Sequence, residues 1–458
     1  MNKSQTTMTP SQIVQELDRY IIGQKEAKKS LAIALRGRWR RMQSHAGIRD
    51  EIVPSNIMII GPTGSGKTEC ARRLAKINEA PFIKTEATKY TERGYVGGEV
   101  EGMVRALVDK SYTMVKKAKT DLFKAQATQK AEDIILDILI PPVNNAHTEE
   151  AKDHKEAKKL NADTRLRFRD QIRKGLVDDR EIEIEVVQTP PSGIGFMGHG
   201  MIDESTMSNL QNMMQKMLLP AHTKKRKVTI AQAKEILIEQ EKNKLIDVEA
   251  LKEEALKKAE LEGIIFIDEI DKIALHNGNS ESSRVSQEGV QRDLLPLVEG
   301  ATVNTKYGTI KTDHILFIAA GAFHQNKPAD LMPELQGRFP IRVYLNSLTQ
   351  QDFFRILKQP QNSLIKQYKA LFQAEGVTLH FQEEAIQEIA HQASTINQNI
   401  ENIGARRLHT VMSHLLQDFL FDMPDRIQSG QTIEVTKALV LKQLAKLAQD
   451  KNTSQYIL

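Results

Sequence analysis

The sequence predicts an α/β protein whose parallel sheet carries a P-loop. Residues 61–68 read Gly-Pro-Thr-Gly-Ser-Gly-Lys-Thr, which fits the pattern G-x-x-x-x-G-K-[ST]. A second short apolar run, residues 264–267, ends in Asp268 and Glu269, an acidic pair at the end of a core strand. These two motifs lie roughly 200 positions apart, far more than one strand–helix–strand step requires, so the sequence also predicts a large insertion within the core.

The P-loop has the flanking structure that its chemistry requires. The apolar run at residues 56–60 predicts a buried strand before the loop, and residues 68–75 have helical spacing after it. Phosphates would then lie at a helix N-terminus, where glycines let backbone N–H groups approach them. Lys67 is expected to reach the β- and γ-phosphates, and the Thr68 hydroxyl to bind Mg²⁺. A chance match in a glycine-rich turn would not have strand and helix on the correct sides.

The acidic pair complements the P-loop. Asp268 is placed to hold Mg²⁺ through water, and Glu269 to activate the attacking water as general base. Alone, the pair could equally be a solvated acidic turn after a strand. Beside a P-loop it predicts hydrolysis of ATP.

Composition limits the remaining possibilities. The 458 residues suffice for about three domains, and no apolar run approaches the roughly 18 residues of a membrane span. Residues 1–5 lack the apolar region of a signal peptide, and Cys70 is the single cysteine, so no disulfide can form within the chain. The net charge of +5 and the 5% aromatic content give no strong case for nucleic acid. We therefore expect a cytoplasmic protein with neither membrane nor nucleic acid as partner.

The N-terminal region predicts two helices. Thr9, Pro10 and Gln12 form a capping pattern that starts the first helix. A second helix is expected over residues 26–41, and its last turns carry several arginines, at positions 36, 38, 40 and 41. These arginines could contact phosphate, but the favoured interpretation is a solvated helix end.

The insertion differs in composition from the core. Residues 116–159 are charged and helical, residues 181–186 alternate as a half-exposed strand, and residues 189–200 are rich in proline and glycine. Methionines at positions 207, 213, 214 and 217 suggest either an adaptable surface or ordinary core. The basic run 224–227 is interpreted as a solvated turn, and residues 234–260 as a helix that leads back to the core. Together they predict an independent, mostly helical domain.

The chain after the acidic pair predicts further core and then a small domain. A helix is expected at residues 282–297 and a buried strand at 314–320. Arg338 follows a glycine, which fits either an arginine finger or a surface salt bridge. From residue 347 onward helices dominate, with short strands near 379–381 and 432–435. The arginine at position 406, at the start of one of these helices, could reach a phosphate, although surface arginines are the usual case.

Taken together, these residues resemble the AAA+ unfoldases of the Clp type, over essentially the whole chain. The resemblance rests on residues 21–24, the P-loop, residues 94–97, the acidic pair, residues 334–338 and 404–407, and the insertion, which is its most specific element. The resemblance implies a P-loop AAA+ core with an inserted domain and a mostly helical α+β small domain. The expected domains are 1–110 and 256–345 for the core, 111–255 for the insertion and 346–458 for the small domain.

The resemblance also implies a homohexamer that binds ATP between subunits. Ile22 would lie against adenine, Arg406 would move the small domain with nucleotide state, Glu334 would lie near nucleotide, and Arg338 would act on the neighbouring subunit's ATP. The expected phosphate-binding residues are Gly64, Ser65, Gly66, Lys67, Thr68 and Glu69. Ala320 departs from the family, because a polar sensor residue usually occupies that position.

Two further segments acquire a role only through this resemblance. Tyr95 and Val96 would line the axial pore and grip unfolded or tagged protein substrates, since apolar contact is non-directional. Without the resemblance, a surface turn with a packed tyrosine is the favoured interpretation. Tyr456, Ile457 and Leu458 would insert into a separate threonine peptidase, whereas a frayed terminus is the ordinary interpretation.

Two other classes of protein remain as alternatives. A nucleic-acid AAA+ motor would need a concentrated basic face and no apolar pore loop, and the nearly balanced charge disfavours it. A chaperone that works without a peptidase is disfavoured less strongly, by the apolar C-terminus.

Overall fold

The structure is a computed structural model that describes residues 8–49, 51–52, 56–90, 98–141, 153–187, 223–275, 281–399 and 402–449. The chain forms two compact units. The first comprises Met1–Lys110, Lys258–Val303 and Thr309–Leu458, and the second comprises Ser111–Lys257 and Asn304–Gly308.

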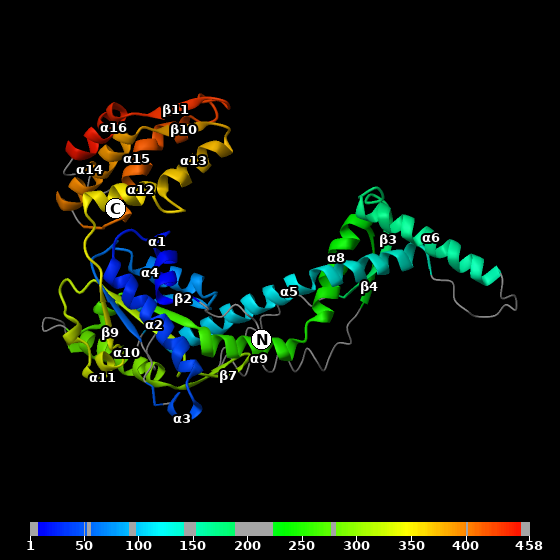
Figure 1. Cartoon of the computed structure of the whole chain (residues 1–458), viewed down its shortest axis with the longest axis horizontal. Coiled ribbons are helices and arrows are strands. Elements are labelled where there is room, and N and C mark those ends of the chain that lie inside the picture. Colours follow the sequence, from blue (N-terminus) through cyan, green and yellow to red (C-terminus); the bar gives the residue numbers. More distant parts are fainter. Residues whose placement is uncertain are drawn as a thin grey trace. The chain divides into compact units, whose positions relative to one another are not determined.

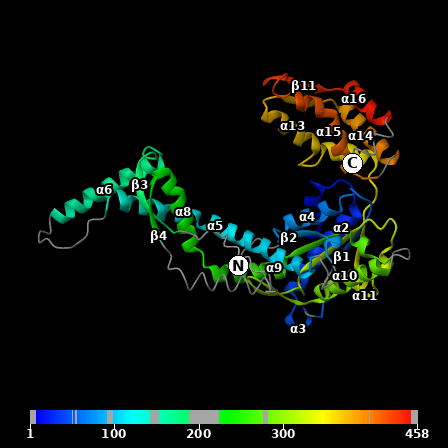
Figure 2. The same cartoon turned by 180° about the vertical axis from the view of Figure 1, so that it is seen from behind.

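The first unit is organised around a five-stranded parallel sheet, shown in Figures 1 and 2. Its strand order is β2-β5-β8-β1-β9, and the strands are β1 (Ile57–Ile60), β2 (Phe82–Glu86), β5 (Ile264–Asp268), β8 (Leu316–Gly321) and β9 (Ile341–Tyr344). This arrangement confirms the predicted fold class. Strand β9 is too weak a pattern to be predicted from the sequence, because only two of its apolar positions are buried or half-buried.

Both faces of the sheet are covered. Helices α1 (Pro10–Asp18), α2 (Lys25–Gln43) and α4 (Lys67–Ile77) pack on one face, where Ile57 and Ile59 point. The alternate residues Met58 and Ile60 are also buried. Burial on both faces explains why these strands read as continuous apolar runs rather than as alternating ones.

The first unit contains further elements between these strands and helices. They are α3 (Ala46–Arg49), η1 (Ala87–Lys89), η2 (Ile270–Ile273), α10 (Glu281–Glu299), β6 (Thr302–Thr305), β7 (Gly308–Lys311), η3 (Pro328–Asp330) and α11 (Pro333–Gly337). The carboxyl ends of the strands lie at one edge because the strands are parallel. The P-loop follows β1, and Asp268 ends β5. The loop after β8 reaches the same edge.

The arginines of α2 are not simply a solvated helix end. The guanidinium of Arg38 is buried, and it donates hydrogen bonds to the carbonyl oxygens of Glu262 and Gly263 at 3.1 and 3.0 Å and of His314 at 2.6 Å. Burial lowers the pKa of Arg38 to about 10. For this residue the solvated interpretation is wrong, because its guanidinium is enclosed by carbonyl groups just before β5 and β8 and hydrogen-bonds to them.

The C-terminal part of the first unit has a hydrophobic core of its own. It contains α12 (Gln350–Lys358), α13 (Leu364–Ala374), β10 (Thr378–Phe381), α14 (Glu383–Asn399), α15 (Arg406–Asp422), β11 (Thr432–Val435) and α16 (Lys437–Gln449). Strands β10 and β11 pair in parallel. Phe353, Phe372 and Leu415 are fully buried in this core, which matches the predicted mixture of helices and short strands.

The second unit is mostly helical. Its elements come from α5 (Glu101–Leu139), α6 (Asp153–Arg173), β3 (Glu181–Val187), β4 (Thr223–Thr229), α8 (Ile230–Leu245) and α9 (Val248–Glu262). The basic run 224–227 is not a turn but part of β4, which pairs antiparallel with β3. Lys225 and Lys227 lie opposite Glu185 and Glu183, so the cross-strand charges favour the strand. The predicted methionine stripe lies outside the described residues.

Candidate functional site

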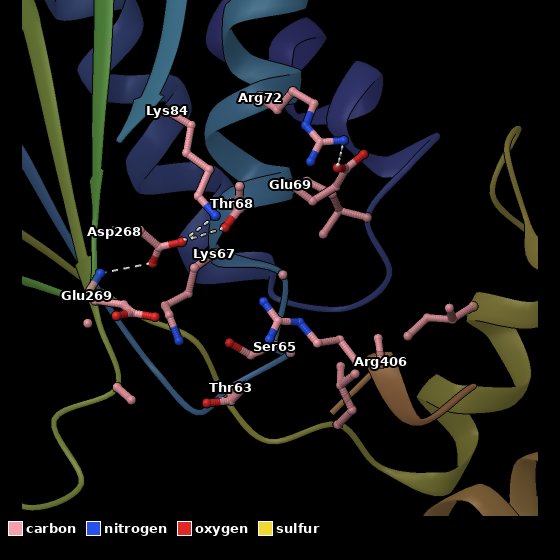
Figure 3. Close-up of a pocket in the computed structure, with 18 of the residues that line it drawn as sticks. Thr63, Ser65, Lys67, Thr68, Glu69, Arg72, Lys84, Asp268, Glu269 and Arg406 are labelled. Carbon is pink, nitrogen blue, oxygen red and sulfur yellow. Dashed lines mark hydrogen bonds and ion pairs between the residues drawn. The ribbon is translucent and has the colours of Figure 1, made fainter. Parts of the chain in front are cut away.

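A cavity of about 940 Å³ lies at the carboxyl edge of the sheet in the first unit. It is lined by the P-loop, the ends of β2 and β5, the loop after β8, residues 20–22 and the start of α15. Figure 3 shows its polar side chains. Charged and hydroxyl groups gather toward the P-loop, while isoleucine and leucine side chains line other parts of the wall. The cavity therefore suits a ligand that has both an anionic and an apolar portion.

The P-loop presents backbone rather than side chains to the cavity. Gly64 and Gly66 have φ angles of +70° and +102°, a region that favours glycine. Gly66 is the N-cap of α4 and offers no side chain to the first turn. The N–H groups of that turn are then available to an anion, and the helix dipole favours negative charge there. The cradle fits phosphate groups.

Lys67 supplies the positive charge of the loop. Its Nζ donates hydrogen bonds to the carbonyl oxygens of Gly61 and Pro62, at 2.6 and 3.0 Å. Burial lowers the pKa of Lys67, and the carboxylates of Asp268 and Asp271 oppose that shift. A bound phosphate would favour the charged ammonium further.

A small polar cluster forms where β5 ends. The Thr68 hydroxyl donates to Asp268 Oδ2 at 3.3 Å, and Lys84 Nζ lies 2.9 Å from the same oxygen. The backbone N–H of Glu269 donates to the other carboxylate oxygen at 3.1 Å (Figure 3). A hydroxyl and a carboxylate are ligand types that Mg²⁺ takes, so the convergence of Thr68 and Asp268 fits this metal.

Glu269 adopts an uncommon backbone conformation. Its φ angle is +57°, in the left-handed region that a residue other than glycine rarely occupies. At this residue the backbone turns away from the direction of β5. The side chain of Glu269 is exposed and lines the cavity. Local strain of this kind concentrates at functional sites. A carboxylate held here can accept a proton from a water molecule near the phosphates.

The opposite wall of the cavity is more apolar. Ile22 is buried and lines it, next to Tyr20 and Ile21. The Tyr20 hydroxyl donates to Gln361 Oε1 at 2.9 Å, and the Arg73 guanidinium lies 3.8 Å from the Tyr20 ring centre. This wall can hold a flat apolar group such as a purine.

The segment before α15 closes the cavity against the P-loop. The backbone N–H of Ala405 donates to the Gly64 carbonyl at 3.0 Å. A Cβ on Gly404 would lie 2.6 Å from the Gly64 carbonyl oxygen, so only glycine permits this approach. The next residue, Arg406, lines the cavity beside Ser65 (Figure 3). A phosphate in the loop and the C-terminal helices can thus influence each other directly.

Known proteins that resemble this chain along its whole length are also ATPases, in agreement with a cavity that fits a nucleotide. Two family patterns match, an AAA domain of the dynein-related subfamily over residues 56–173 and an AAA domain of the Cdc48 subfamily over residues 180–342. The "ATP-dependent protease ATPase subunit HslU" of Cytophaga hutchinsonii is 54% identical and covers 100% of both chains. Proteins with the same name from Desulfotalea psychrophila and Chlorobaculum tepidum are 50% and 49% identical, covering 99% and 98% of this chain and 99% and 96% of their own.

The chain belongs to the HslU family of AAA+ ATPases. It is accordingly an enzyme that binds and hydrolyses ATP. Among the described residues, every helix is too short or too polar to cross a membrane.

The structure brings most of the predicted nucleotide residues of this HslU-family chain together. Those that line the cavity are Ile22, Gly64, Ser65, Gly66, Lys67, Thr68, Glu69, Asp268, Glu269 and Arg406. The carboxylate of Glu69 pairs with Arg73 at 2.6 Å and with Arg72 at 3.2 Å. Its backbone N–H, at the start of α4, is therefore the group left for a phosphate.

Two predicted residues lie away from this cavity. Glu334 and Arg338 are exposed, at the start and the end of α11, and do not line it. Arg338 instead pairs with Glu299, with its Nη2 2.8 Å from Oε1. The predicted pore residues Tyr95 and Val96 and the predicted docking residues Tyr456, Ile457 and Leu458 lie outside the described residues.

Several polar residues of the cavity were not predicted from the sequence. Lys84 lies on β2, next to the strand that ends in Asp268, and its Nζ contacts that carboxylate. A lysine within a predicted strand beside the acidic pair was the available signal. Ala320 is fully buried in β8 and cannot act as a polar sensor. The loop beyond it places His324, Gln325 and Asn326 on the cavity wall instead.

Proposed function

We propose that this chain is an ATP-dependent unfoldase that assembles as a cytoplasmic homohexamer and passes substrate proteins through its axial pore into the threonine peptidase HslV. The observation that carries the proposal is the contact of Ala405 with the P-loop, because it links the nucleotide cavity to the C-terminal helices. The relatives' shared name, which describes the ATPase subunit of an ATP-dependent protease, supports the peptidase partner.

The hydrolytic step follows from the arrangement of the cavity. The N–H groups of the P-loop and the Lys67 ammonium bind the phosphates and hold the terminal one in position. Thr68 and Asp268 would hold Mg²⁺, which neutralises charge on the phosphates when bound. Glu269 takes a proton from the attacking water, and this general base should contribute about 10²–10⁴-fold to the rate.

The remaining roles connect hydrolysis to movement. Ile22 packs on the adenine, and Arg406 binds the phosphates from the side of the C-terminal helices. Arg338, with Glu334 beside it on α11, faces the ATP of the neighbouring subunit and stabilises transition-state charge there. Tyr95 and Val96 grip unfolded or tagged substrate in the pore, and residues 456–458 dock the peptidase.

A folded fluorescent reporter that carries an unfolded tag tests this function. We expect loss of fluorescence that requires both this chain and ATP, with degradation only when the peptidase is added. The variant Tyr95→Ala should hydrolyse ATP but leave the reporter folded, and unfolding at the parental rate would remove the pore assignment.

Other outcomes of the same experiment separate the alternatives. Loss of fluorescence with no stimulation of any threonine peptidase would favour a chaperone that works alone. ATP hydrolysis that is stimulated by DNA and leaves every folded reporter intact would favour a nucleic-acid motor.

A further inference from the structure

Gln291 is an uncharged, polar side chain that lies completely inside the ATPase unit. It belongs to α10, and its exposed fraction is 0%. Its Nε2 donates to the carbonyl oxygen of Ile273 at 2.6 Å. Its Oε1 accepts from the backbone N–H of Met332 at 2.7 Å. One side chain thus joins two backbone segments that are distant in sequence.

Each of these two segments carries a functional group. Ile273 ends η2, the short helix whose N-cap is the proposed general base Glu269. Met332 is the N-cap of α11, which is followed directly by Arg338. The Gln291 amide therefore connects the segment of the chain's own ATP-hydrolysis site to the segment that ends at Arg338, the arginine that we assign to the neighbouring subunit's ATP.

Neighbouring contacts make this junction specific. The backbone N–H of Leu275 donates to the Asp330 carbonyl at 3.0 Å, so the two segments also touch one step further along. The last residue of α10, Glu299, pairs with Arg338 through Oε1. Helix α10 therefore holds the segment of Arg338 at both its beginning and its end.

The chemistry of the amide suits this bridging position. A buried carbonyl and a helix-starting N–H each need a partner, and a glutamine supplies one donor and one acceptor in a single rigid group. An apolar side chain of the same size would satisfy neither group. Because both bonds are short and the Gln291 side chain is fully buried, displacement of η2 should displace the start of α11.

We infer that Gln291 is a positioning residue that couples the catalytic carboxylates of one subunit to the arginine presented to the next. This inference rests on the proposed role of Arg338. It predicts that breaking the bridge slows hydrolysis by misplacing Arg338, without weakening nucleotide binding. It also predicts that the bridge has no further effect once Arg338 is gone.

Two variants of the full chain break the bridge from opposite sides. Gln291→Met keeps the size of the side chain and removes both hydrogen bonds. Met332→Pro removes the N–H together with the side chain, and φ −55° and ψ 136° at Met332 and ψ 156° at Leu331 suit a proline there. Met332→Ala is the matched control for the lost side chain. Gln392→Met is the control for a lost amide, because the Gln392 amide bonds within its own helix.

Steady-state and single-turnover ATP hydrolysis then give the test. We expect both bridge variants to lose about tenfold or more in kcat, because small misplacements at a reacting centre have effects of this size. KM should stay within about twofold, which marks loss of a transition-state interaction rather than of binding. Both controls should keep the parental kcat, and thermal melting identifies a variant that merely fails to fold.

A double-mutant cycle with Arg338→Ala decides the matter. In that background, Gln291→Met and Met332→Pro should change the single-turnover rate by less than about twofold, because coupled residues are not additive. Independent, multiplicative losses would overturn the coupling role and leave a general structural one. A normal kcat in both bridge variants, with a slow Arg338→Ala, would overturn this inference alone. A parental rate in Arg338→Ala would overturn both the inference and the proposed role of Arg338.

Discussion

The two units of this chain differ in the interactions that stabilise each of them internally. The ATPase unit contains two extensive clusters of buried apolar side chains, one around the parallel sheet and one among the C-terminal helices. The second unit has smaller clusters, around Ile135, Ile184 and Leu237 and around Leu251. Several of its leucines are exposed, for example Leu122 at 72%.

Ion pairs between helices add to these small clusters in the second unit. Helices α5 and α6 are joined by three of them, Asp137 with Arg165, Asp133 with Arg169 and Glu132 with Arg173. The partners follow one another at helical spacing, so they form a ladder along the two helices. We expect the second unit to open at a lower free energy than the ATPase unit because its apolar clusters are smaller. Its ion pairs should make that opening respond to salt.

The largest expected effect tests whether ATP hydrolysis depends on a carboxylate of the ATPase unit. Glu269→Gln should lower the rate of ATP hydrolysis by about 10²–10⁴-fold, because the amide cannot accept the proton of water. Nucleotide binding and subunit assembly should persist, since the phosphate contacts come from the P-loop. Turnover and equilibrium nucleotide binding measured on the same sample check this. Asp271→Asn is not a suitable control because Asp271 lines the same cavity. Glu249→Gln is suitable because the Glu249 side chain, at the start of α9, is 78% exposed. Normal turnover in Glu269→Gln would assign the base elsewhere.

The next effect tests whether the two units unfold separately. Ile184, 1% exposed on β3, and Leu31, fully buried on α2 in the same core as Cys70, belong to different units. Each substitution by alanine should lower the free energy of unfolding of its own unit by about 2–5 kcal/mol. Hydrogen exchange reports opening of the second unit, and labelling of Cys70 reports opening of the ATPase unit.

Cys70 is suited to this purpose. It is the single cysteine of the chain, its side chain is fully buried, and burial raises its thiol pKa to about 12. Below that pH the native thiol stays protonated and unreactive, so labelling requires opening. Ile184→Ala should speed exchange without speeding labelling of Cys70, and Leu31→Ala should do the opposite. Equal acceleration of both signals in either variant would show that the units unfold together.

The role of a residue could be predicted from the sequence where neighbouring residues in the chain determine it. It could not be predicted where the role depends on contacts with residues distant in the sequence. The P-loop glycines, Lys67 and Asp268 could be predicted because strand, loop and helix fix their relative positions. Arg38 could not, because its carbonyl partners come from positions more than two hundred residues away. The strand β4 was read as a turn because its charges make sense only opposite those of β3. Gln291 gave no signal at all, since its partners are backbone groups.

A smaller effect concerns the closure of the cavity. Gly404→Ala places a methyl group against the Gly64 backbone, and the φ angle of +57° adds strain. We expect the contact of Ala405 with Gly64 to loosen and the affinity for ATP to fall by about tenfold, on the scale of 1–3 kcal/mol for local strain. Gly430→Ala is the control, with φ +91° and nothing within 4 Å of the added Cβ. Equal effects of the two variants on nucleotide binding would mean that backbone strain alone is responsible.

The smallest effect tests the ion-pair ladder. Asp133 and Asp137 are exposed at 43% and 54%, so each pair should contribute about 1 kcal/mol at most. The double variant Asp133→Asn, Asp137→Asn should exchange faster in α5 and α6 at low salt and leave labelling of Cys70 unchanged. The difference from the parent should disappear near 1 M salt, because charges are then screened beyond about 3 Å. Lys252→Gln, which removes an exposed pair within one helix, is the control. If the double variant exchanges like the parent at low salt, packing rather than charge joins α5 to α6, and the contrast between the units is one of core size alone.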